Sequence, residues 1–282
     1  MAGAQLLKGQ AIAENYLDSA ARQIRQIKAE HGELALATIQ VGRAKDTVLY
    51  SSYLGRTLKK MGIRWAPNLF PENESESAVI EKIRKLNDSP RITGILVFSP
   101  LPGRLSPTNV LSNIHILKDV EGRTFLKSHF GVFSPTANAV LALIESKMPN
   151  LAGKKAVVVG HGDLVGKPTA ILLMDRLATV TVCHARTKNI ESHISQADIV
   201  VAVVGKPNII KGKWIKKGAM VIDVGENRVA GKLVGDIEFE PARARASYLS
   251  PVPGGVGPVT NVMLIKNLIT LQKIRESMNG IC

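Results

Sequence analysis

The sequence predicts an α/β protein with mostly parallel strands, organised as two domains. Helix-like and strand-like segments alternate along the whole chain of 282 residues, which is long enough for one large or two medium domains. In the second half, short apolar strands follow one another in quick succession, and a glycine-rich loop separates one of them from a helix. This alternation of short apolar strands with helices is typical of a nucleotide-binding sheet.

The first half contains the expected elements of one α/β domain. Apolar residues recurring every three or four positions predict an amphipathic helix from Gln10 to His31. Thr47 is the expected N-cap of the second helix, which runs to Met61 and stops at Gly62. The loop over 99–103 lies just beyond a strand, where α/β folds bind ligands. The expected elements in order are a helix over 10–31, a strand over 34–41, helices over 47–61 and 77–87, and a strand over 92–97.

After Gly122 the composition changes, and a second series of elements begins. Pro168 suits the first turn of a helix, so a helix is expected to begin there. No long linker separates the two halves, which are expected to pack tightly, and the last helix is expected to return to the first domain. The expected elements in order are a helix over 138–146, a strand over 156–159, the helix from Pro168, a strand over 179–183, a helix over 190–196, strands over 199–204 and 220–224, and a helix over 261–277.

Composition excludes several classes of protein. The 37 Lys and Arg exceed the 23 Asp and Glu by 14, but the basic residues are scattered and aromatic residues make up only 4%, so an anionic small molecule fits the charge better than nucleic acid. No apolar run reaches the length of a membrane helix, and residues 1–10 show no signal-peptide pattern. Cys183 and Cys282 have no zinc spacing, and no metal site is expected. A soluble, cytoplasmic protein is expected.

A glycine motif occupies the strand-to-helix turn of the second half. Gly160, Gly162 and Gly166, with His161 inside the motif, follow a strand and precede a helix. Glycines in this context let backbone N–H groups approach a pyrophosphate. The spacing is one residue longer than the common dinucleotide fingerprint, so a purely structural turn is the alternative.

The next strand indicates which dinucleotide is preferred. A site for NAD usually carries a carboxylate there, about 20 residues after the glycines. Here the strand is followed by His184, Ala185, Arg186 and Lys188, without a carboxylate. Basic groups suit a 2′-phosphate, so NADP is expected and NAD is less favoured; a solvated basic turn is the alternative.

In this order, the segments resemble the methylenetetrahydrofolate dehydrogenase/methenyltetrahydrofolate cyclohydrolase family of the bifunctional FolD type. The resemblance spans nearly the whole chain. Its carriers are Gly94-Ile-Leu-Val97 with Pro100-Leu-Pro102, Lys118-Asp-Val-Glu-Gly122, the loop from Gly160 to Pro168, Thr179-Val-Thr-Val-Cys-His184, Gly205-Lys-Pro207, Val221-Ile-Asp-Val-Gly225 and Pro251-Val-Pro-Gly-Gly-Val-Gly-Pro258.

The resemblance implies a folate-binding domain over 1–121, rejoined by the C-terminal helix over 261–282, and a Rossmann NAD(P)-binding domain over 122–260, with a cleft between them. It implies a cytoplasmic homodimer that oxidises 5,10-methylenetetrahydrofolate to the methenyl cation and hydrolyses that cation to 10-formyltetrahydrofolate. It also implies that the folate contacts Tyr50 and Glu121, the loop residues Pro100 and Leu101, and Gly254, Gly255, Pro258 and Thr260.

Several positions depart from the family pattern. The family's helix lysine, four residues after its tyrosine, is Leu54, and its glutamine after Gly-Ile-Leu-Val is Phe98. The pterin-anchoring aspartate is Glu121. Around the cofactor, His161-Gly162 replaces Arg-Ser, Ala185 replaces a serine, and Glu226 stands where an apolar residue is usual.

These departures affect the two reactions differently. Hydration of the methenyl cation needs water activation, and losing one acid–base group costs about 10² to 10⁴ in rate. Leu54 and Phe98 have no donor or acceptor, so cyclohydrolase activity is expected to be weak or lost. Hydride transfer mainly needs two rings held face to face, which Tyr50 and Glu121 still serve.

Other interpretations stay open at this stage. Tyr50 could be an ordinary half-buried tyrosine, Glu121 a solvated or capping carboxylate, His161 a surface histidine and the loop over 251–258 a structural turn. At the level of the whole chain, the alternatives are a fully bifunctional enzyme and a non-catalytic paralogue that binds a folate-like ligand or a partner protein.

Overall fold

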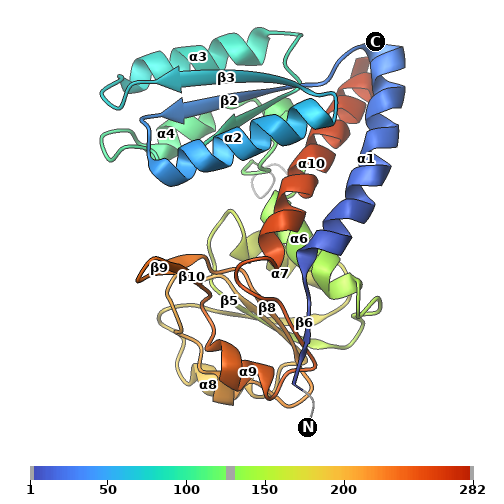
Figure 1. Cartoon of the computed structure of the whole chain (residues 1–282), viewed down its shortest axis with the longest axis vertical. Helices are drawn as coiled ribbons and strands as arrows, with labels where there is room; N and C mark the ends of the chain where they lie inside the picture. Colours follow the sequence, from blue (N-terminus) through green and yellow to red (C-terminus); the bar gives the residue numbers. More distant parts are fainter. Residues whose placement is uncertain (1–2, 125–130, 280–282) are drawn as a thin grey trace. The chain divides into compact units, whose positions relative to one another are not determined.

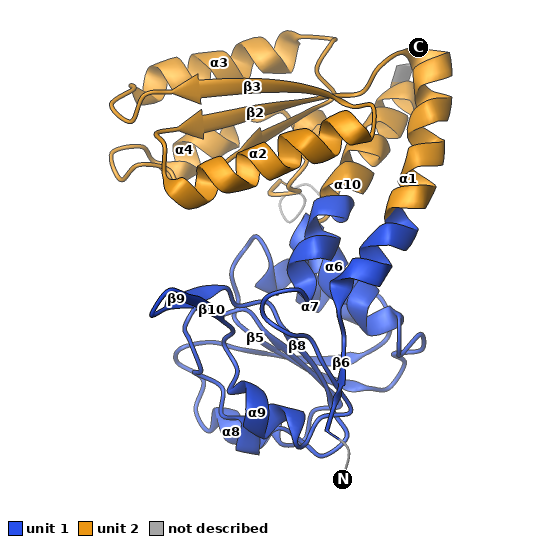
Figure 2. Cartoon of the chain, viewed as in Figure 1, with its two compact units in different colours: residues 1–16, 134–263 blue, residues 17–133, 264–282 orange. Residues whose placement is uncertain are grey.

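The computed structural model describes residues 3–124 and 131–279 (Figure 1). The chain divides into two compact units, residues 1–16 with 134–263 and residues 17–133 with 264–282 (Figure 2). The long helices α1 (Gly9–His31) and α10 (Val256–Asn279) each contribute residues to both units. The domain limits expected from the sequence differ from these units chiefly in two segments: residues 1–16 were expected in the first domain, and residues 122–133 in the second.

The unit of residues 17–133 and 264–282 is built on a three-stranded parallel sheet. The strand order is β3-β2-β4, and every residue of the central strand β2 is buried. Pro67 lies within β3, an edge strand, and edge strands tolerate a residue without a backbone N–H. The elements of this unit after α1 are β2 (Ala35–Val41), α2 (Lys45–Lys60), β3 (Arg64–Phe70), α3 (Glu76–Asp88), β4 (Gly94–Val97), α4 (Pro107–Ser112) and η1 (Ile116–Lys118).

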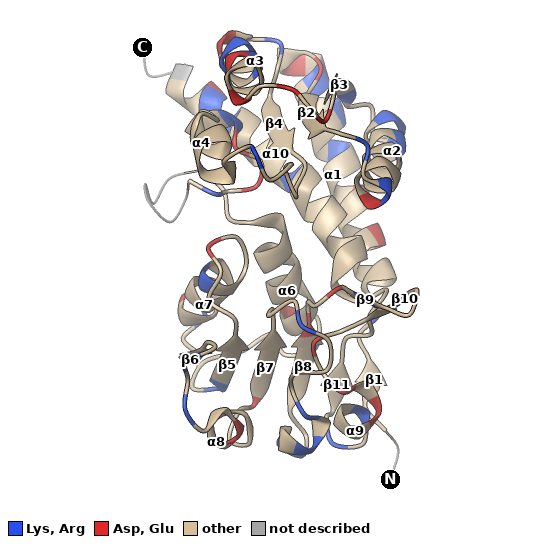
Figure 3. Ribbon diagram, turned by 90° about the vertical axis from the view of Figure 1, so that its left-hand side faces the viewer, with Lys and Arg blue, Asp and Glu red and all other residues tan. Residues whose placement is uncertain are grey.

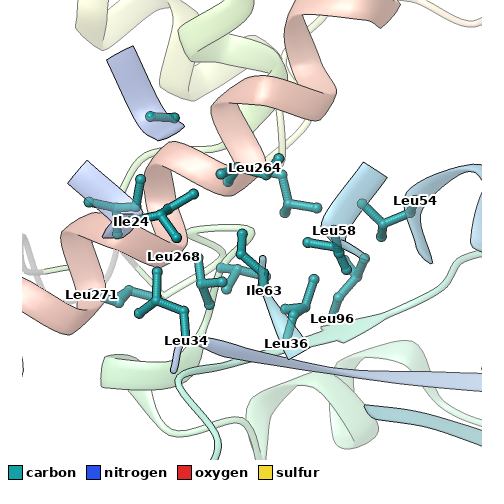
Figure 4. Close-up of a cluster of buried hydrophobic side chains, with 14 of the residues drawn as sticks. Ile24, Leu34, Leu36, Leu54, Leu58, Ile63, Leu96, Leu264, Leu268 and Leu271 are labelled. Carbon is teal, nitrogen blue, oxygen red and sulfur yellow. The ribbon is translucent and has the colours of Figure 1, made fainter. Parts of the chain in front are cut away.

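Alternate residues of β2 pack into two apolar clusters. Leu36 belongs to a cluster that includes residues of α1, α2 and α10 (Figure 4). Ala35, Ala37 and Ile39 belong to a second cluster, which includes residues of α3 and α4. Because successive side chains of a strand point to opposite faces, the sheet is covered on both sides, as a parallel sheet requires.

The unit of residues 1–16 and 134–263 contains a six-stranded sheet in the order β1-β11-β8-β7-β5-β6, with parallel pairing throughout. Strand β6 pairs with one side of β5 and β7 with the other, so the strand order reverses at β5. The crevice beyond the carboxyl ends of β5 and β7 is therefore a topological switch point, where such sheets bind dinucleotides. The elements are β1 (Gln5–Leu6), α6 (Pro135–Glu145), β5 (Lys155–Val159), α7 (Gly166–Met174), β6 (Thr179–Cys183), α8 (Ile190–Ile194), β7 (Ile199–Ala202), η2 (Gly212–Trp214), β8 (Met220–Asp223), the antiparallel hairpin β9 (Asn227–Val229) and β10 (Lys232–Val234), α9 (Phe239–Arg243) and β11 (Tyr248–Leu249).

The α/β class, the two-domain organisation and the parallel Rossmann-like sheet predicted from the sequence are confirmed. The N-cap assignment of Thr47 is wrong: α2 begins at Lys45 after Ala44, so Thr47 lies inside the helix. Strands β1, β3, β9, β10 and β11 were not expected. Four of them are only two or three residues long, and β3 contains Pro67, which is uncommon inside a strand.

Lys and Arg occur in both units (Figure 3), in keeping with the scattered basic residues of the sequence. Among the described residues, no helix is long and apolar enough to cross a membrane, and no group of three or more His, Cys, Asp or Glu side chains could hold a metal ion. Cys183 is buried at the end of β6, and burial raises the pKa of its thiol. Cys282 lies outside the described residues.

Candidate active site: a dinucleotide pocket and an apolar corner

The glycine motif forms the turn between β5 and α7, and two of its glycines are sterically required. Gly160 has a φ of +118°, and a Cβ there would lie 2.2 Å from the carbonyl oxygen of Val203. A Cβ on Gly166 would lie 2.2 Å from the carbonyl oxygen of Gly160. Gly162 faces open space. The turn therefore packs against the end of β7 and the start of α7, and it leaves exposed backbone at Gly162 for a ligand to approach.

A pocket of about 510 Å³ opens at the carboxyl ends of β5, β6 and β7. It coincides with the switch point of the sheet, and its wall combines apolar side chains with a few polar ones. This is the composition expected of a cofactor site. Its lining residues include Gly160, His161, Gly162, His184, Ala185, Lys206, Ile209 and Trp214. Of the sequence-predicted cofactor residues, Gly160, His161, Gly162, His184 and Ala185 line this pocket, whereas Gly166, Arg186 and Glu226 do not. Gly166 is the first residue of α7.

The two histidines of this pocket lie ring to ring. Their ring centroids are 5.3 Å apart, with the planes tilted by 58°. The Nδ1 atom of His184 accepts the backbone N–H of Arg186 at 3.2 Å, and the backbone N–H of His184 donates to the Thr187 hydroxyl at 2.9 Å. His184, Ala185 and Arg186 are exposed, so the loop after β6 presents them to solvent at the pocket.

Two buried carboxylates hold the loop that forms another wall of the pocket. Asp236 accepts the backbone N–H groups of Val204, Gly205 and Lys206 and the side-chain amide of Asn227. Asp223, at the end of β8, accepts three further backbone N–H groups, including that of Asp236 at 2.9 Å. Burial raises the pKa of Asp223 to about 6.

The sequence reasoning missed both residues. Asp223 stands inside the Val221–Gly225 motif, and Asp236 follows Gly235. For Asp223, the sequence signal was an apolar strand that ends in Asp just before a glycine.

Glu226 lies on the hairpin side of this unit and is exposed. A Cβ built on Gly257 would lie 3.4 Å from its Oε1 atom, so the carboxylate is close to the first turn of α10, where the helix dipole favours negative charge. Thr260 donates its hydroxyl to the Val256 carbonyl at 3.3 Å. The glycine loop before α10 has a φ of +98° at Gly254. Gly255 is buried, and Pro258 is half-buried.

In the other unit, Tyr50, Leu54 and Phe98 share an apolar corner. Tyr50 is 37% exposed on α2, and its ring meets that of Phe98 edge to face at a centroid distance of 5.7 Å. Leu54 is completely buried one helical turn later, and Phe98 is 5% exposed just after β4. Both belong to the same apolar cluster, in which Leu54 lies near Leu58 and Leu96 (Figure 4).

Pro100 and Leu101, in the loop after β4, differ in exposure. Pro100 is exposed, whereas Leu101 is buried in the second cluster with Val97 and Ile39. Of the two, only Pro100 is exposed to a ligand; Leu101 anchors the loop.

Glu121 forms an ion pair with Arg123. The Nε and Nη2 atoms of Arg123 both lie 2.9 Å from Oε2 of Glu121. The side chain of Glu121 is 18% exposed and that of Arg123 is 23% exposed. Burial raises the pKa of Glu121, an effect that Arg123 opposes. Asp119 fixes the turn by accepting the backbone N–H groups of Glu121 and Thr124. Arg123 was not expected from the sequence.

Comparison with known families matches both parts of the chain. Residues 7–121 match the tetrahydrofolate dehydrogenase/cyclohydrolase catalytic domain, and residues 134–276 match the NAD(P)-binding domain of the same family.

Individual relatives agree in sequence and in fold. The chain is 40% identical to the bifunctional protein FolD 2 of Geobacter sulfurreducens, over 98% of this chain and 99% of that protein. The crystal structure of the bifunctional FolD enzyme from Campylobacter jejuni superimposes with a TM-score of 0.91 at 33% identity, covering 96% of this chain and 99% of that one. The Trypanosoma brucei FolD structure, complexed with NADP and an inhibitor, gives a TM-score of 0.89 at 34% identity, covering 98% and 99%.

Proposed function

The chain belongs to the tetrahydrofolate dehydrogenase/cyclohydrolase family, and from that membership we propose that it is an NADP-dependent 5,10-methylenetetrahydrofolate dehydrogenase with weak or no cyclohydrolase activity. The observation that carries the proposal is the apolar corner formed by Leu54 and Phe98 beside Tyr50.

The apolar corner argues against hydration of the methenyl cation. Adding water to that cation requires a group that takes a proton from water as the new bond forms. Leu54 and Phe98 offer no such group, and both are buried in one apolar cluster. Hydration of the methenyl cation depends on acid–base groups more than hydride transfer does, so the loss of such a group should slow hydration more.

The oxidation step does not depend on those two positions. When bound, the nicotinamide accepts the hydride, and the lone pairs of the folate nitrogens stabilise the cation that results. The protein's task is to hold the pterin and the nicotinamide in register, which is a matter of orientation. Tyr50 remains exposed enough to pack against a ring, and Glu121 retains a carboxylate for N–H groups of the pterin.

NADP is the proposed cofactor because the loop after β6 presents His184 and Arg186 and no carboxylate. The β5–α7 turn precedes a helix and leaves Gly162 open at the pocket, so backbone N–H groups there can approach a pyrophosphate. The T. brucei relative binds NADP in its solved structure. NAD is the less favoured cofactor.

A fully bifunctional enzyme is the second candidate. It is favoured by the 40% identity, over nearly the full length of both chains, to a protein named bifunctional FolD 2. In that case, groups other than residues 54 and 98 activate water.

The dehydrogenase activity is tested by following NADPH formation from NADP and 5,10-methylenetetrahydrofolate, with NAD and with folate-free reactions as controls. We expect NADPH to form only when the folate is present, and to form faster than NADH at equal cofactor concentration. No reduction of either cofactor would contradict the proposal and favour a non-catalytic paralogue.

The cellular and oligomeric parts of the proposal rest on the family resemblance alone. A cytoplasmic homodimer is proposed, with the folate as its small-molecule partner and without nucleic-acid or membrane partners. Sedimentation equilibrium would give twice the chain mass of 30.4 kDa if the dimer forms, and the mass of one chain if it does not.

A further inference from the structure

A second hollow, of about 550 Å³, lies within the unit of residues 17–133 and 264–282. Residues of α2, of the turn after it and of the edge strand β3 line it, and α2 packs beside β3 (Figure 1). Its volume is comparable to that of the dinucleotide pocket and falls within the range of small-molecule sites. We propose that this hollow binds a small aromatic phosphate, with the phosphate group on Arg56 and Lys59 and the ring against Trp65. Binding there requires no part of the proposed dehydrogenase reaction.

The hollow lies on the side of α2 that faces away from Tyr50. Lys59 follows Tyr50 by nine residues, about two and a half turns of an α-helix, so the two side chains leave α2 in opposite directions. Leu54 and Leu58 point into the apolar cluster (Figure 4), and neither of them lines the hollow. A ligand in the hollow would therefore occupy a site distinct from the apolar corner.

Positive charge dominates the described residues that line the hollow. Three of them, Arg56, Lys59 and Arg64, are cations against the one carboxylate of Glu33, which leaves an excess of two positive charges. The Glu33 carboxylate lies 3.8 Å from Nε of Arg64, and the Arg64 guanidinium also donates to the carbonyl oxygen of Arg91. Arg64 is thus already engaged by groups of the protein.

Arg56 and Lys59 are the two cations that remain to meet an anion. They are exposed and lie three residues apart, on one face of α2. Within the described parts of the chain, neither side chain makes a hydrogen bond or an ion pair. A guanidinium can hold two oxygens of one phosphate group, and an ammonium group adds a further donor. A phosphate group carries about 1.5 to 2 negative charges at neutral pH, which matches the excess in the hollow better than a single carboxylate does.

Trp65 supplies an aromatic wall that is held in place. Its Nε1 atom donates to the Thr38 hydroxyl at 3.0 Å. A Cβ on Gly55 would lie 2.4 to 2.9 Å from three atoms of the indole, so the glycine makes the room in which the ring lies. Glycine destabilises a helix interior relative to alanine, and at this position that cost secures the placement of the indole. Trp65 is half-buried and lines the hollow, where a flat ring of a ligand can pack against it.

Trp65 also reports on binding, because the chain contains two tryptophans and the other, Trp214, lines the dinucleotide pocket. In full-length Trp214→Phe, tryptophan fluorescence comes from Trp65 alone. This protein is titrated with phenyl phosphate, inorganic phosphate and phenol, which present the ring with the phosphate, the phosphate alone and the ring alone. Arg56→Gln and Lys59→Gln are then added singly, with Lys60→Gln as the matched control. Lys60 is exposed beside Lys59 on the same helix and does not line the hollow.

We expect phenyl phosphate to change the emission of Trp65 saturably and to bind more tightly than inorganic phosphate or phenol. Arg56→Gln and Lys59→Gln should each weaken its binding by about tenfold, the size of one hydrogen bond to a charged group. Lys60→Gln should bind it as the parent protein does. Thermal unfolding of each variant checks that the substitution leaves the protein folded.

Three results would overturn the proposal. They are the absence of a saturable change with phenyl phosphate, equal affinity for phenyl phosphate and inorganic phosphate, and equal affinity for phenyl phosphate in Arg56→Gln, Lys59→Gln and Lys60→Gln. If Trp214→Phe does not fold, calorimetric titration of the wild type and the three glutamine variants with phenyl phosphate tests the same expectation. Equal affinities in all four proteins would again count against the site.

Discussion

At the scale of single residues, the proposed loss of cyclohydrolase activity rests on Leu54 and Phe98, which stand where the family pattern has a lysine and a glutamine. Both side chains are buried in one apolar cluster, so each contributes to the packing of the domain. Burying a neutral polar group without a hydrogen-bond partner costs about 2 to 7 kcal/mol, and burying an unpaired charge costs more. A single polar or charged side chain at position 54 or 98 should therefore destabilise the fold.

This cost leads to a prediction about restoring the pair. Leu54→Lys alone should lower the melting temperature and give little hydrolysis of methenyltetrahydrofolate. Leu54→Lys with Phe98→Gln should recover part of the stability and raise hydrolysis by about 10² or more, since a positioned acid–base group is worth that much. Thermal unfolding and a direct hydrolysis assay measure both effects.

Leu58→Lys is the matched control, because Leu58 is equally buried on the same helix and in the same cluster. It should destabilise the protein without any gain in hydrolysis. A gain of the same size in Leu58→Lys, or none in the double variant, would show that the two positions are not what limits the reaction.

Glu121 and Arg123 give a second prediction at this scale. Arg123 opposes the rise in the pKa of Glu121 that burial causes. Removing the guanidinium in Arg123→Gln should therefore raise that pKa further, and Glu121 will remain protonated to higher pH. If the ionised carboxylate binds the pterin, the acid limb of the kcat/KM profile will shift to higher pH, and Arg123→Lys will shift it less. An unchanged acid limb in Arg123→Gln would remove Glu121 from the binding site.

The sequence could supply the positions of these residues but not their surroundings. Tyr50, Leu54 and Phe98 could be located by motif and by helical spacing. The cluster that Leu54 and Phe98 share depends on the pairing of β4 with β2 and on α10, which lies more than 150 residues from Phe98 along the chain. Arg123 had no motif to indicate it, because its partner is defined by a turn that Asp119 holds in place.

At the scale of elements, the walls of the dinucleotide pocket are held by buried carboxylates. Asp236 fixes the loop after β7, and Asp223 fixes the start of the segment that carries Asp236. Elements with strong periodicity or clear flanking glycines could be predicted, as the strand β6 shows with the same limits, Thr179–Cys183. The two-residue strands β1 and β11 could not, since their pairing is set by tertiary contacts.

Asp223 gives a prediction about pH and stability. Its pKa is raised from 3.8 to about 6 in the folded protein. Between these values the folded state holds a proton that the unfolded state has released, so this contribution to stability is present below about pH 4 and is lost as the pH rises through about 6. Asp223→Asn, which cannot ionise, should lack that fall. Urea unfolding from about pH 4 to pH 7 measures it, and equal slopes in both proteins would contradict the assignment.

At the scale of the whole molecule, each of the two units carries a different part of the proposed site. One carries the glycine turn and the dinucleotide pocket, and the other carries Tyr50, Glu121 and the apolar corner. The fold class and the family could be predicted from the sequence, because several long motifs occur in the same order as in the family. The chemical consequence of the departures is what the sequence left open, and it depends on whether another group supplies the acid–base function.

Direct observation of methenyltetrahydrofolate hydrolysis tests the central claim most directly. The purified protein is mixed with 5,10-methenyltetrahydrofolate, and the loss of its absorbance is compared with an enzyme-free reaction in the same buffer. We predict that the two rates will be equal, while the same preparation forms NADPH from 5,10-methylenetetrahydrofolate. Faster loss in the presence of the protein would contradict the account and show that the enzyme is bifunctional despite Leu54 and Phe98.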